Sequence, residues 1–315
     1  MTRFTLNFGD ATAVVRVIKS RYAAIITLFQ LVKSASTICL LICQIFVGFK
    51  GVSMNTDTVP KSGWGQRLSW LSFVLSIGGL LSALVAAAGS GADFWSFGTG
   101  FFILRYAFYA AIVGGLGAVL ALIISYRTGV STLRLNVISF VVAAAFVFYL
   151  SNQISTAKSV PAIHDVATNL DDLPQFQTLI VRADNLDGVP DDGRPDLAAL
   201  KPDDRWKQIH REAYGDIRTV RIPAPPESAL QQIEALVADR GWQVAKVDRQ
   251  VGTIEATDTT FFFRFKDDVI VRVRADPARP GASLIDMRSI SRVGGSDVGV
   301  NAKRIRAFFR DLQKG

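Results

Sequence analysis

Two histidines are the first candidates for chemistry, because imidazole exchanges protons near neutral pH. His164 is followed directly by Asp165, and a carboxylate beside an imidazole is able to orient the ring for base work. Neighbouring side chains of an extended chain point apart, so the two groups need not touch. Two interpretations of His164 and Asp165 stay open, a structural role and a ligand-binding or catalytic role. His210 lies in a polar helical stretch, where we expect it to be solvated.

A glycine turn close to two arginines forms the second candidate. Arg288 and Arg292 precede Gly294, Ser296 and Asp297 in the run RSISRVGGSD. A turn that meets a helix N-terminus leaves N–H groups free, and nearby guanidinium groups would help them to bind phosphate or carboxylate. Alternatively, Ser296 or Asp297 caps the helix and occupies those donors internally. The spacing differs from the GxGxxG and P-loop motifs, so nucleotide binding is not predicted.

Acidic residues on predicted strands form the third candidate. Asp258 and Thr259 are expected to lie across a hairpin from Asp268, with Arg288 and other arginines nearby. Acids and arginines on one sheet form ion-pair networks more often than hydrolytic pairs of carboxylates, so we favour a network. A GxSxG motif for a serine triad is absent, and both cysteines precede residue 44. We therefore predict no catalytic residue, no metal site and no cofactor.

The chain that positions these residues has two halves of different composition. A hydrophobic content of 50% and a mean hydropathy of +0.29 are typical of a protein that lies partly in lipid. Residues 1–157 contain 11 Lys or Arg and 3 Asp or Glu, whereas residues 158–315 contain 24 of each kind. The basic excess therefore flanks hydrophobic runs, which indicates membrane topology and argues against a nucleic-acid partner.

Three uncharged runs are long enough to cross a bilayer, at about 68–88, 106–126 and 135–151. Each approaches the roughly 20 residues that a hydrocarbon core of about 30 Å requires. The first connecting loop contains no Lys or Arg, whereas the second is flanked by Arg127 and Arg134. The positive-inside rule therefore places the second loop in the cytoplasm and everything after about residue 152 outside it. We expect a three-span membrane domain over residues 54–152.

The segment 1–53 has two interpretations. Residues 22–49 are apolar enough for an extra span, but Lys33 interrupts them and both flanks are basic. Alternatively, translation begins at Met54, which opens a short polar and cationic lead into the first secure span. Both interpretations stay open.

The predicted spans carry two further patterns. Small residues recur every fourth position, which lets helices pack closely on each other or on a second copy of the chain. They are Gly79, Ala83 and Ala87, and Ala107, Ala111 and Gly115. Aromatic residues from Phe94 to Phe102 surround Arg105 at the outer end of the second span. We expect Arg105 to reach the headgroups within this aromatic belt, with a lipid-headgroup site there as the alternative.

The polar half is predicted to be an extended linker with loops over residues 153–202, followed by an α+β domain over 203–315. Patterning predicts helices at about 203–212, 226–240 and 298–313 and strands at 217–222, 242–247, 252–257, 261–265, 269–274 and 283–290. Alternation of Phe261, Phe263 and Phe265 before the turn residues 266–268 predicts a hairpin with one buried face. On the last helix we expect Arg304 on the polar side. An antiparallel sheet with helices on one face, of the helix-grip kind, satisfies this order.

Four stretches resemble the bacterial family called domain of unknown function 1499. They are SVPAIHD at 159–165, IEATDTT at 254–260, FKDDV at 265–269 and RSISRVGGSDVGVN at 288–301. The resemblance covers about residues 155–313, and the three spans with FWSFG at 94–98 look like the membrane-anchored members. It implies an extracytoplasmic domain in the bacterial inner (cytoplasmic) membrane and favours a start at Met54. It implies no activity, because the family has none established.

We therefore predict an integral membrane protein that presents an extracytoplasmic ligand- or partner-binding domain in the bacterial envelope. The expected partners are membrane lipid, an envelope protein or an anionic ligand, and a second copy of the chain through the span faces. The alternative is a membrane-tethered hydrolase that uses His164 with a nearby carboxylate, which requires His164 to lie in an open cleft within hydrogen-bond reach of that carboxylate. The candidate ligand-binding residues are His164, Asp165, Asp258, Thr259, Asp268, Arg288, Arg292, Gly294, Ser296 and Asp297.

Overall fold

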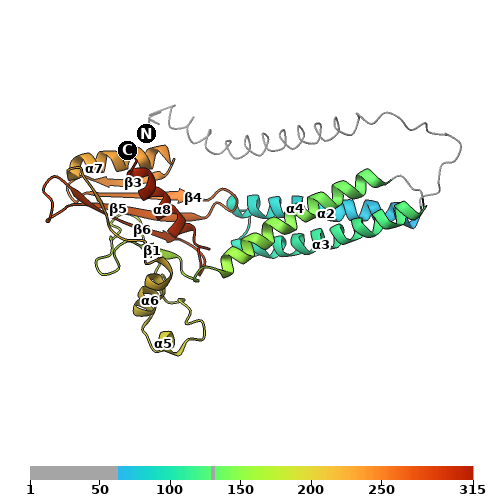
Figure 1. The fold of residues 1–315 in the computed structure, drawn as a ribbon, viewed down its shortest axis with the longest axis horizontal. Helices are drawn as coiled ribbons and strands as arrows, with labels where there is room; N and C mark the ends of the chain where they lie inside the picture. The colour runs from blue at the N-terminus through green and yellow to red at the C-terminus, as the bar shows by residue number, and fades with distance from the viewer. Residues whose placement is uncertain (1–62, 129–131, 315) are drawn as a thin grey trace, which may run out of the picture. The chain divides into compact units, whose positions relative to one another are not determined.

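The computed structural model describes residues 63–128 and 132–314 (Figure 1). The predictions for residues 1–53 and for a start at Met54 lie outside these residues. The described part consists of three long helices followed by a domain of sheet and helices. The predicted fold class is therefore confirmed.

The three long helices are α2 (Trp64–Gly91), α3 (Phe97–Thr128) and α4 (Leu133–Lys158). Each is long and apolar enough to cross a membrane, as the uncharged runs predict. They extend beyond those runs because polar flanking residues continue the helical hydrogen bonding. The small residues let the helices approach closely within the chain: a Cβ atom added to Gly79 would lie 2.8 Å from the Ala107 carbonyl oxygen, and one added to Gly115 would lie 3.1 Å from Ala143 Cβ.

The domain that follows contains one antiparallel sheet in the strand order β1-β6-β5-β4-β3, with β2 also paired to β6. The strands are β1 (Asp165–Ala167), β2 (Val220–Ile222), β3 (Gln243–Asp248), β4 (Thr253–Thr259), β5 (Lys266–Ala275) and β6 (Ser283–Ser291). The helices are α5 (Pro195–Ala198), α6 (Pro202–Tyr214), α7 (Pro226–Asp239) and α8 (Val300–Leu312). Most predicted elements are present, with boundaries shifted by a few residues.

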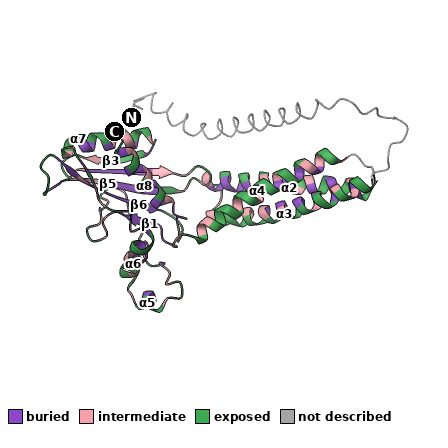
Figure 2. Ribbon diagram, in the orientation of Figure 1, coloured by how far each residue is buried: buried purple, intermediate pink, exposed green. Residues whose placement is uncertain are grey.

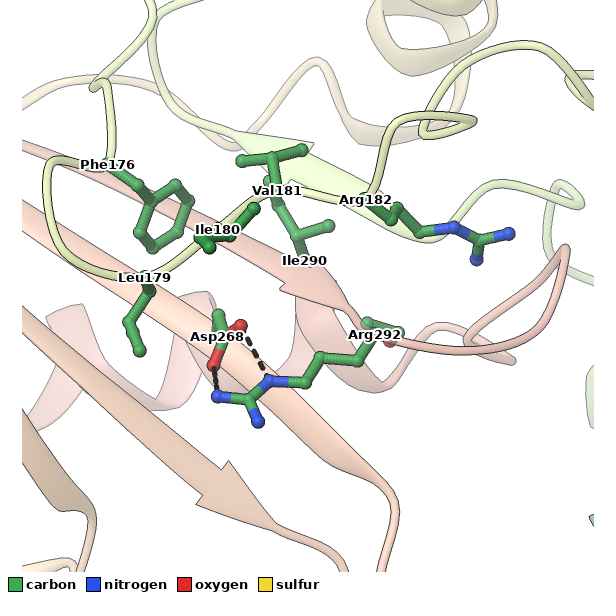
Figure 3. A pocket seen from close by; sticks show the side chains of 9 residues that line it. Phe176, Leu179, Ile180, Val181, Arg182, Asp268, Ile290 and Arg292 are labelled. Atoms are coloured by element: carbon green, nitrogen blue, oxygen red, sulfur yellow. Dashed lines mark hydrogen bonds and ion pairs between the residues drawn. The ribbon is translucent and has the colours of Figure 1, made fainter.

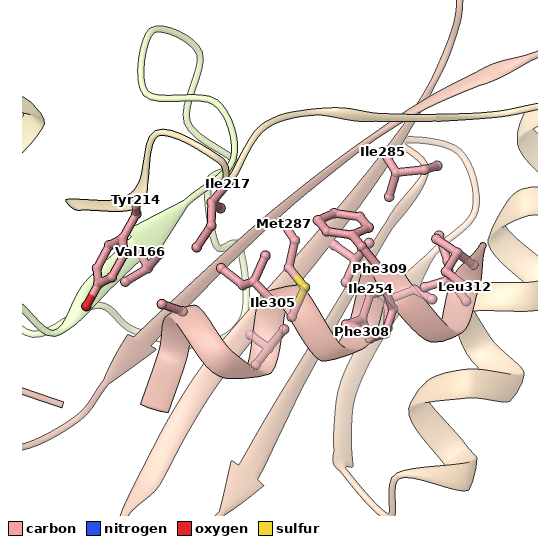
Figure 4. Packing of buried hydrophobic residues seen from close by; sticks show 14 of the residues in the cluster. Val166, Tyr214, Ile217, Ile254, Ile285, Met287, Ile305, Phe308, Phe309 and Leu312 are labelled. Carbon is pink, nitrogen blue, oxygen red and sulfur yellow. The ribbon is translucent and has the colours of Figure 1, made fainter. Parts of the chain in front are cut away.

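One face of the sheet packs against α7 and α8. Ile305, Phe308 and other apolar residues of α8 point at Ile254 and Met287 on the strands, as Figure 4 shows. The Phe308 ring stacks on Trp242 with centroids 5.7 Å apart. This contact forms because α8 repeats apolar residues with helical spacing while the strands alternate. The helix face of the sheet is therefore the hydrophobic core of the domain.

The opposite face of the sheet is polar, and it is also largely buried. Alternation places a row of charged side chains on it: Glu255, Asp268, Arg272, Arg274, Asp286, Arg288 and Arg292. Residues 169–187, which we call the cover segment, lie over this row and contact it through Asp172 and Pro174 among others. In Figure 2, β5 and β6 are accordingly buried along most of their length.

The predicted strand at 261–265 is wrong. These residues form the loop between β4 and β5, which we call the aromatic loop (residues 260–265), and β5 begins at Lys266. Asp267 and Asp268, which we expected in a turn, are buried strand residues because arginines pair with both carboxylates. The phenylalanines leave the sheet because Phe263 and Phe265 stack instead on rings at the beginning of α3. The pairing of β4 with β5 thus persists with a different turn.

Candidate ligand-binding cleft

His164 and Asp165 point to different partners. The buried Asp165 carboxylate accepts hydrogen bonds from Arg288 Nη2 at 2.7 Å and from Asn185 Nδ2 at 2.6 Å. His164 is also buried, with its Nδ1 atom 3.4 Å from the Gly295 carbonyl oxygen. Its Nε2 atom has no hydrogen-bond partner in the part of the chain that the structure describes. A hydrolase would require His164 to lie in an open cleft with a carboxylate bonded to its ring. These contacts do not form that arrangement.

The prediction that His210 is solvated is wrong. Its side chain is buried beneath β1, where Nε2 accepts the Ala167 backbone N–H at 3.2 Å. Burial lowers the pKa of His210 to about 4, because a protonated ring at this position would lack the water that stabilises its charge. The neutral imidazole is therefore a structural acceptor at the edge of the sheet.

The glycine turn before α8 contains its own acceptors. The Asp297 carboxylate accepts the backbone N–H of Gly299 at 2.8 Å and of Asn301 at 2.7 Å, and Ser296 Oγ accepts that of Val298 at 3.2 Å. Burial raises the pKa of Asp297 above its usual value. Gly294 adopts a left-handed φ of 89°, a conformation that favours glycine. The N-cap residue of α8 is Gly299 and not Ser296 or Asp297, but Asp297 does occupy backbone N–H groups at the beginning of the helix.

Most predicted acidic residues belong to ion-pair networks, as we favoured. Asp258 accepts Arg304 Nε at 2.9 Å, and Arg304 Nη2 donates to Asp267 at 2.6 Å. Arg304 is buried, so its predicted place on the polar side of α8 is wrong. It lies between α8 and the sheet because it pairs there with the carboxylates of Asp258 and Asp267. Thr259 lies half-buried at the end of β4. Asp258, Asp267 and Arg304 thus pair with one another within the described residues.

Glu255 fastens the cover segment to the polar face. Its fully buried carboxylate accepts three consecutive backbone N–H groups, those of Gln177 at 2.7 Å, Thr178 at 3.0 Å and Leu179 at 2.8 Å. Three aligned donors around one carboxylate offset much of the cost of burying its charge. Glu255 is absent from the predicted site residues, although its place between Ile254 and Ala256 on a strand puts it on the face opposite the core.

A cleft of about 150 Å³ lies between the cover segment and the ends of β5 and β6 (Figure 3). One wall is apolar and comes from the cover segment, and the other comes from the strands. The lining residues are Phe176, Leu179, Ile180, Val181, Arg182, Asp268, Ile290, Ser291 and Arg292. The cleft brings together two predicted site residues, Asp268 and Arg292, and the other eight lie elsewhere in the domain. The apolar run FQTLIV within an otherwise polar linker was the signal that could have indicated its second wall.

The strand wall of the cleft contains a guanidinium group held in place by a carboxylate of the same wall. Arg292 donates from Nε and Nη2 to the Asp268 carboxylate at 2.8 and 2.7 Å, and Nη2 also reaches Thr257 Oγ1. This pairing raises the pKa of Arg292 above its usual value, so the group stays charged. Its Nη1 atom makes no hydrogen bond to any described residue. Arg182 turns away, donating to Asp184 and the Gly294 carbonyl oxygen (Figure 3).

The cleft lies near the contact between the domain and the helices. Asp268 follows Phe265 by three residues, and the Phe265 ring centroid is 4.6 Å from that of Phe97 in the first turn of α3. A strand advances about 3.3 Å per residue, so the cleft begins about 10 Å along β5 from this contact. The cleft is therefore on the side of the domain that contacts the beginning of α3.

Comparison with known families identifies most of the domain. A family model described as "Protein of unknown function (DUF1499)" matches residues 164–312, from the residue before β1 to the end of α8. No curated protein matches the chain.

Proposed function

Residues 164–312 form a domain that matches the DUF1499 family of proteins of unknown function, and from that premise we propose a function for its cleft. We propose that the protein is a membrane-anchored binding protein whose cleft receives the anionic headgroup of a lipid. The observation that carries the proposal is the charged Arg292 guanidinium group beside an apolar wall. It lies on the side of the domain that contacts the beginning of α3.

The size of the cleft supports a ligand that enters by one end. Sites that enclose a drug-sized molecule are about 300–1,000 Å³ in volume, whereas this cleft measures about 150 Å³. A phosphate group with its glycerol carbons fits such a volume while the remainder of the lipid stays outside. The Ile180 side chain, 89% exposed at the rim, offers an apolar surface to that remainder.

The chemistry of the lining supports an anion at the inner end. Asp268 fixes the Arg292 plane through two parallel hydrogen bonds and leaves Nη1 to donate outward. A guanidinium group held in one orientation loses little entropy when it binds phosphate or carboxylate. A ligand lying against the apolar residues beside it would displace water from Arg292, which strengthens the charge-assisted bond.

The proposal includes an orientation in the bacterial inner membrane. The loop between α3 and α4 is flanked by Arg127 and Arg134, whereas residues 92–96 between α2 and α3 contain no Lys or Arg. This asymmetry favours a cytoplasmic α3–α4 loop and an extracytoplasmic C-terminal domain. The lipid would then come from the outer leaflet of that membrane.

The test measures lipid binding to the full chain by native mass spectrometry in a neutral detergent. The probes are short-chain phosphatidylglycerol, short-chain phosphatidylcholine and inorganic phosphate, so that a lipid headgroup is distinguished from a free anion. Ile180→Glu places a like charge at the rim, and its cost to folding is small because the side chain is exposed. Val251→Glu makes the same change at a side chain that is 63% exposed in the β3–β4 turn.

We expect the wild type and Val251→Glu to bind phosphatidylglycerol more tightly than phosphatidylcholine, and Ile180→Glu to lose this preference. Loss of one charge-assisted contact corresponds to about tenfold in the dissociation constant. Arg292→Gln should have the same effect as Ile180→Glu. Equal binding by all variants would refute the proposal, and binding of inorganic phosphate alone would identify a free-anion site instead.

A further inference from the structure

The aromatic loop has no assigned role in the cleft, and its contacts point to a second surface. We infer that residues 260–265 insert into the interfacial layer of the membrane, so that the domain is anchored to a lipid surface at a point separate from its covalent link to α4. The partner is the bilayer itself. The inference uses Phe261 and Phe262, whereas the proposed headgroup site uses Ile180 and Arg292, so either is able to fail alone.

Two rings of the aromatic loop are directed away from the core. Phe261 is 61% exposed and Phe262 is 50% exposed, and their rings contact each other edge to face at 5.2 Å. Removing a phenylalanine side chain from water is favourable in proportion to the apolar area that is buried. Two adjacent exposed rings in this turn therefore leave a substantial apolar surface that no other described residue covers.

The other two rings join the loop to the ends of the spanning helices. Phe263 stacks on Phe101 of α3 at 5.0 Å, and Phe265 lies 4.6 Å from Phe97. On α2, a Cβ atom added to Gly91 would lie 2.5 Å from Cγ of Arg264, so the loop fits closely against the last turn of that helix. These contacts place the loop where α2 ends and α3 begins.

The neighbouring surface of the helices has the character of a membrane interface. Phe94, Phe102 and Tyr106 are exposed near the beginning of α3, as the predicted aromatic belt requires. Exposed Arg264 lies within the loop and exposed Lys266 follows it, and exposed Arg105 lies about two turns into α3. Aromatic rings with cations beside them suit the boundary between acyl chains and phosphates. This continuity with the lipid-facing helices favours lipid over a protein partner.

The loop is held in one shape. The Thr260 backbone N–H donates to the Phe265 carbonyl oxygen at 2.9 Å, and the Phe265 N–H donates to Thr260 Oγ1 at 2.9 Å. Arg264 adopts a left-handed φ of 57°, a conformation that is unfavourable for a residue other than glycine and persists only where its surroundings hold it. The exposed rings are therefore presented by a closed turn, which reduces the entropy lost when they enter lipid.

The first test uses spin labels on the full chain in nanodiscs of phosphatidylcholine and phosphatidylglycerol. Cys39→Ser and Cys43→Ser remove the native thiols, and single cysteines replace Phe261, Phe262 or Val251. Val251 is the matched control, because it is an apolar residue whose exposure (63%) is close to that of Phe261 (61%) and it lies in the turn at the other end of β4. Collision with oxygen, which concentrates in lipid, is compared with collision with a water-soluble nickel chelate.

We expect the ratio of oxygen to nickel collisions to be several-fold higher at positions 261 and 262 than at 251, at a depth of about 5–10 Å. Ratios at 261 and 262 equal to that at 251 would overturn the inference.

A second measurement avoids substitutions. The unaltered protein is illuminated in nanodiscs that contain a lipid with a photoreactive group near the glycerol, and crosslinked peptides are identified by mass spectrometry. Crosslinks to residues 260–266 together with the helices would support the inference, and crosslinks confined to the helices would refute it. Inorganic phosphate binding or headgroup preference has no bearing on this result, which keeps it distinct from the test of the cleft.

Discussion

The two faces of the sheet are buried by different physics. On the helix face, Ile254, Met287 and their neighbours pack against α8, and the contacts are apolar and largely non-directional. On the other face, charged side chains are covered by residues 169–187 through ion pairs of Asp172 with Arg272 and Arg274 and through hydrogen bonds to Glu255. The cleft lies on this second face.

The difference indicates which face is able to open. Separating α8 from the sheet would expose apolar surface and would cost free energy in proportion to its area. Lifting the cover segment would instead exchange its hydrogen bonds for bonds to water, with a smaller net cost. The polar face, which the cover segment closes through charged groups, is therefore the face that we expect to admit a ligand. The apolar face maintains the fold. The following substitutions test this distinction, from the largest expected effect to the smallest.

Removal of the Phe308 ring tests the helix face. Phe308→Ala should lower the free energy of unfolding by about 4 kcal/mol, because it deletes a fully buried ring and its stack on Trp242. Denaturant unfolding of the full chain in detergent, followed by tryptophan fluorescence, measures the change. A loss below about 1 kcal/mol would show that this face does not maintain the fold.

Removal of one buried charge tests the polar face. Arg288→Met should cost about 3 kcal/mol, because Asp165 is left buried without its cation. Adding Asp165→Leu should recover most of the loss, because it removes the unpaired charge. If the loss came from a cavity left by the arginine, the second substitution would not recover it. Arg249→Met, which breaks an exposed pair with Glu234, is the control and should change stability by less than about 1 kcal/mol. The same unfolding assay separates these outcomes, and failure of the double variant to recover would contradict the comparison.

The pH dependence of stability tests the neutral His210. Its pKa is about 4 in the folded protein against 6.5 in the unfolded chain, so unfolding takes up a proton as the pH falls below 6.5. The free energy of unfolding should therefore decrease by about 2 kcal/mol from pH 7 to pH 5 through this group. His210→Gln, which retains an acceptor for the Ala167 N–H, should lose that component. An identical pH dependence in both proteins would contradict the assignment.

The smallest effect is expected at the fastening of the cover segment. Glu255→Gln removes the charge and one acceptor oxygen and should weaken the segment by about 1 kcal/mol. Hydrogen exchange at Gln177, Thr178 and Leu179 should then be about fivefold faster. Amides of α8 serve as the internal control and should exchange at the wild-type rate. Equal acceleration in α8 would mean that the two faces open together.

Sequence patterns predicted those parts of the fold that a single periodicity determines. The uncharged runs correspond to α2, α3 and α4, and the spacing of Ile305, Phe309 and Leu312 predicted the buried side of α8. The aromatic loop was assigned to a strand because alternating phenylalanines match the strand pattern equally well. Their partners, Phe97 and Phe101, lie more than 150 residues earlier in the chain, where local spacing carries no information about them.

Only the charged residues of the cleft were among the residues predicted from the sequence. Asp268 and Arg292 were identified from their charges, and an ion-pair network was favoured over a hydrolytic pair. The apolar wall was not identified, because a loop folded back over a sheet leaves no periodic signal. Glu255 was missed for a related reason: its partners are backbone N–H groups, which every residue except proline possesses.

Hydrogen exchange of the wild type in nanodiscs tests the lipid-headgroup proposal most directly. Exchange of residues 176–182 is compared between discs of phosphatidylglycerol and discs of phosphatidylcholine. We predict slower exchange at 176–182 in phosphatidylglycerol, with α8 unchanged and with the difference abolished in Ile180→Glu. Exchange at 176–182 that is identical in the two lipids would contradict a headgroup in the cleft.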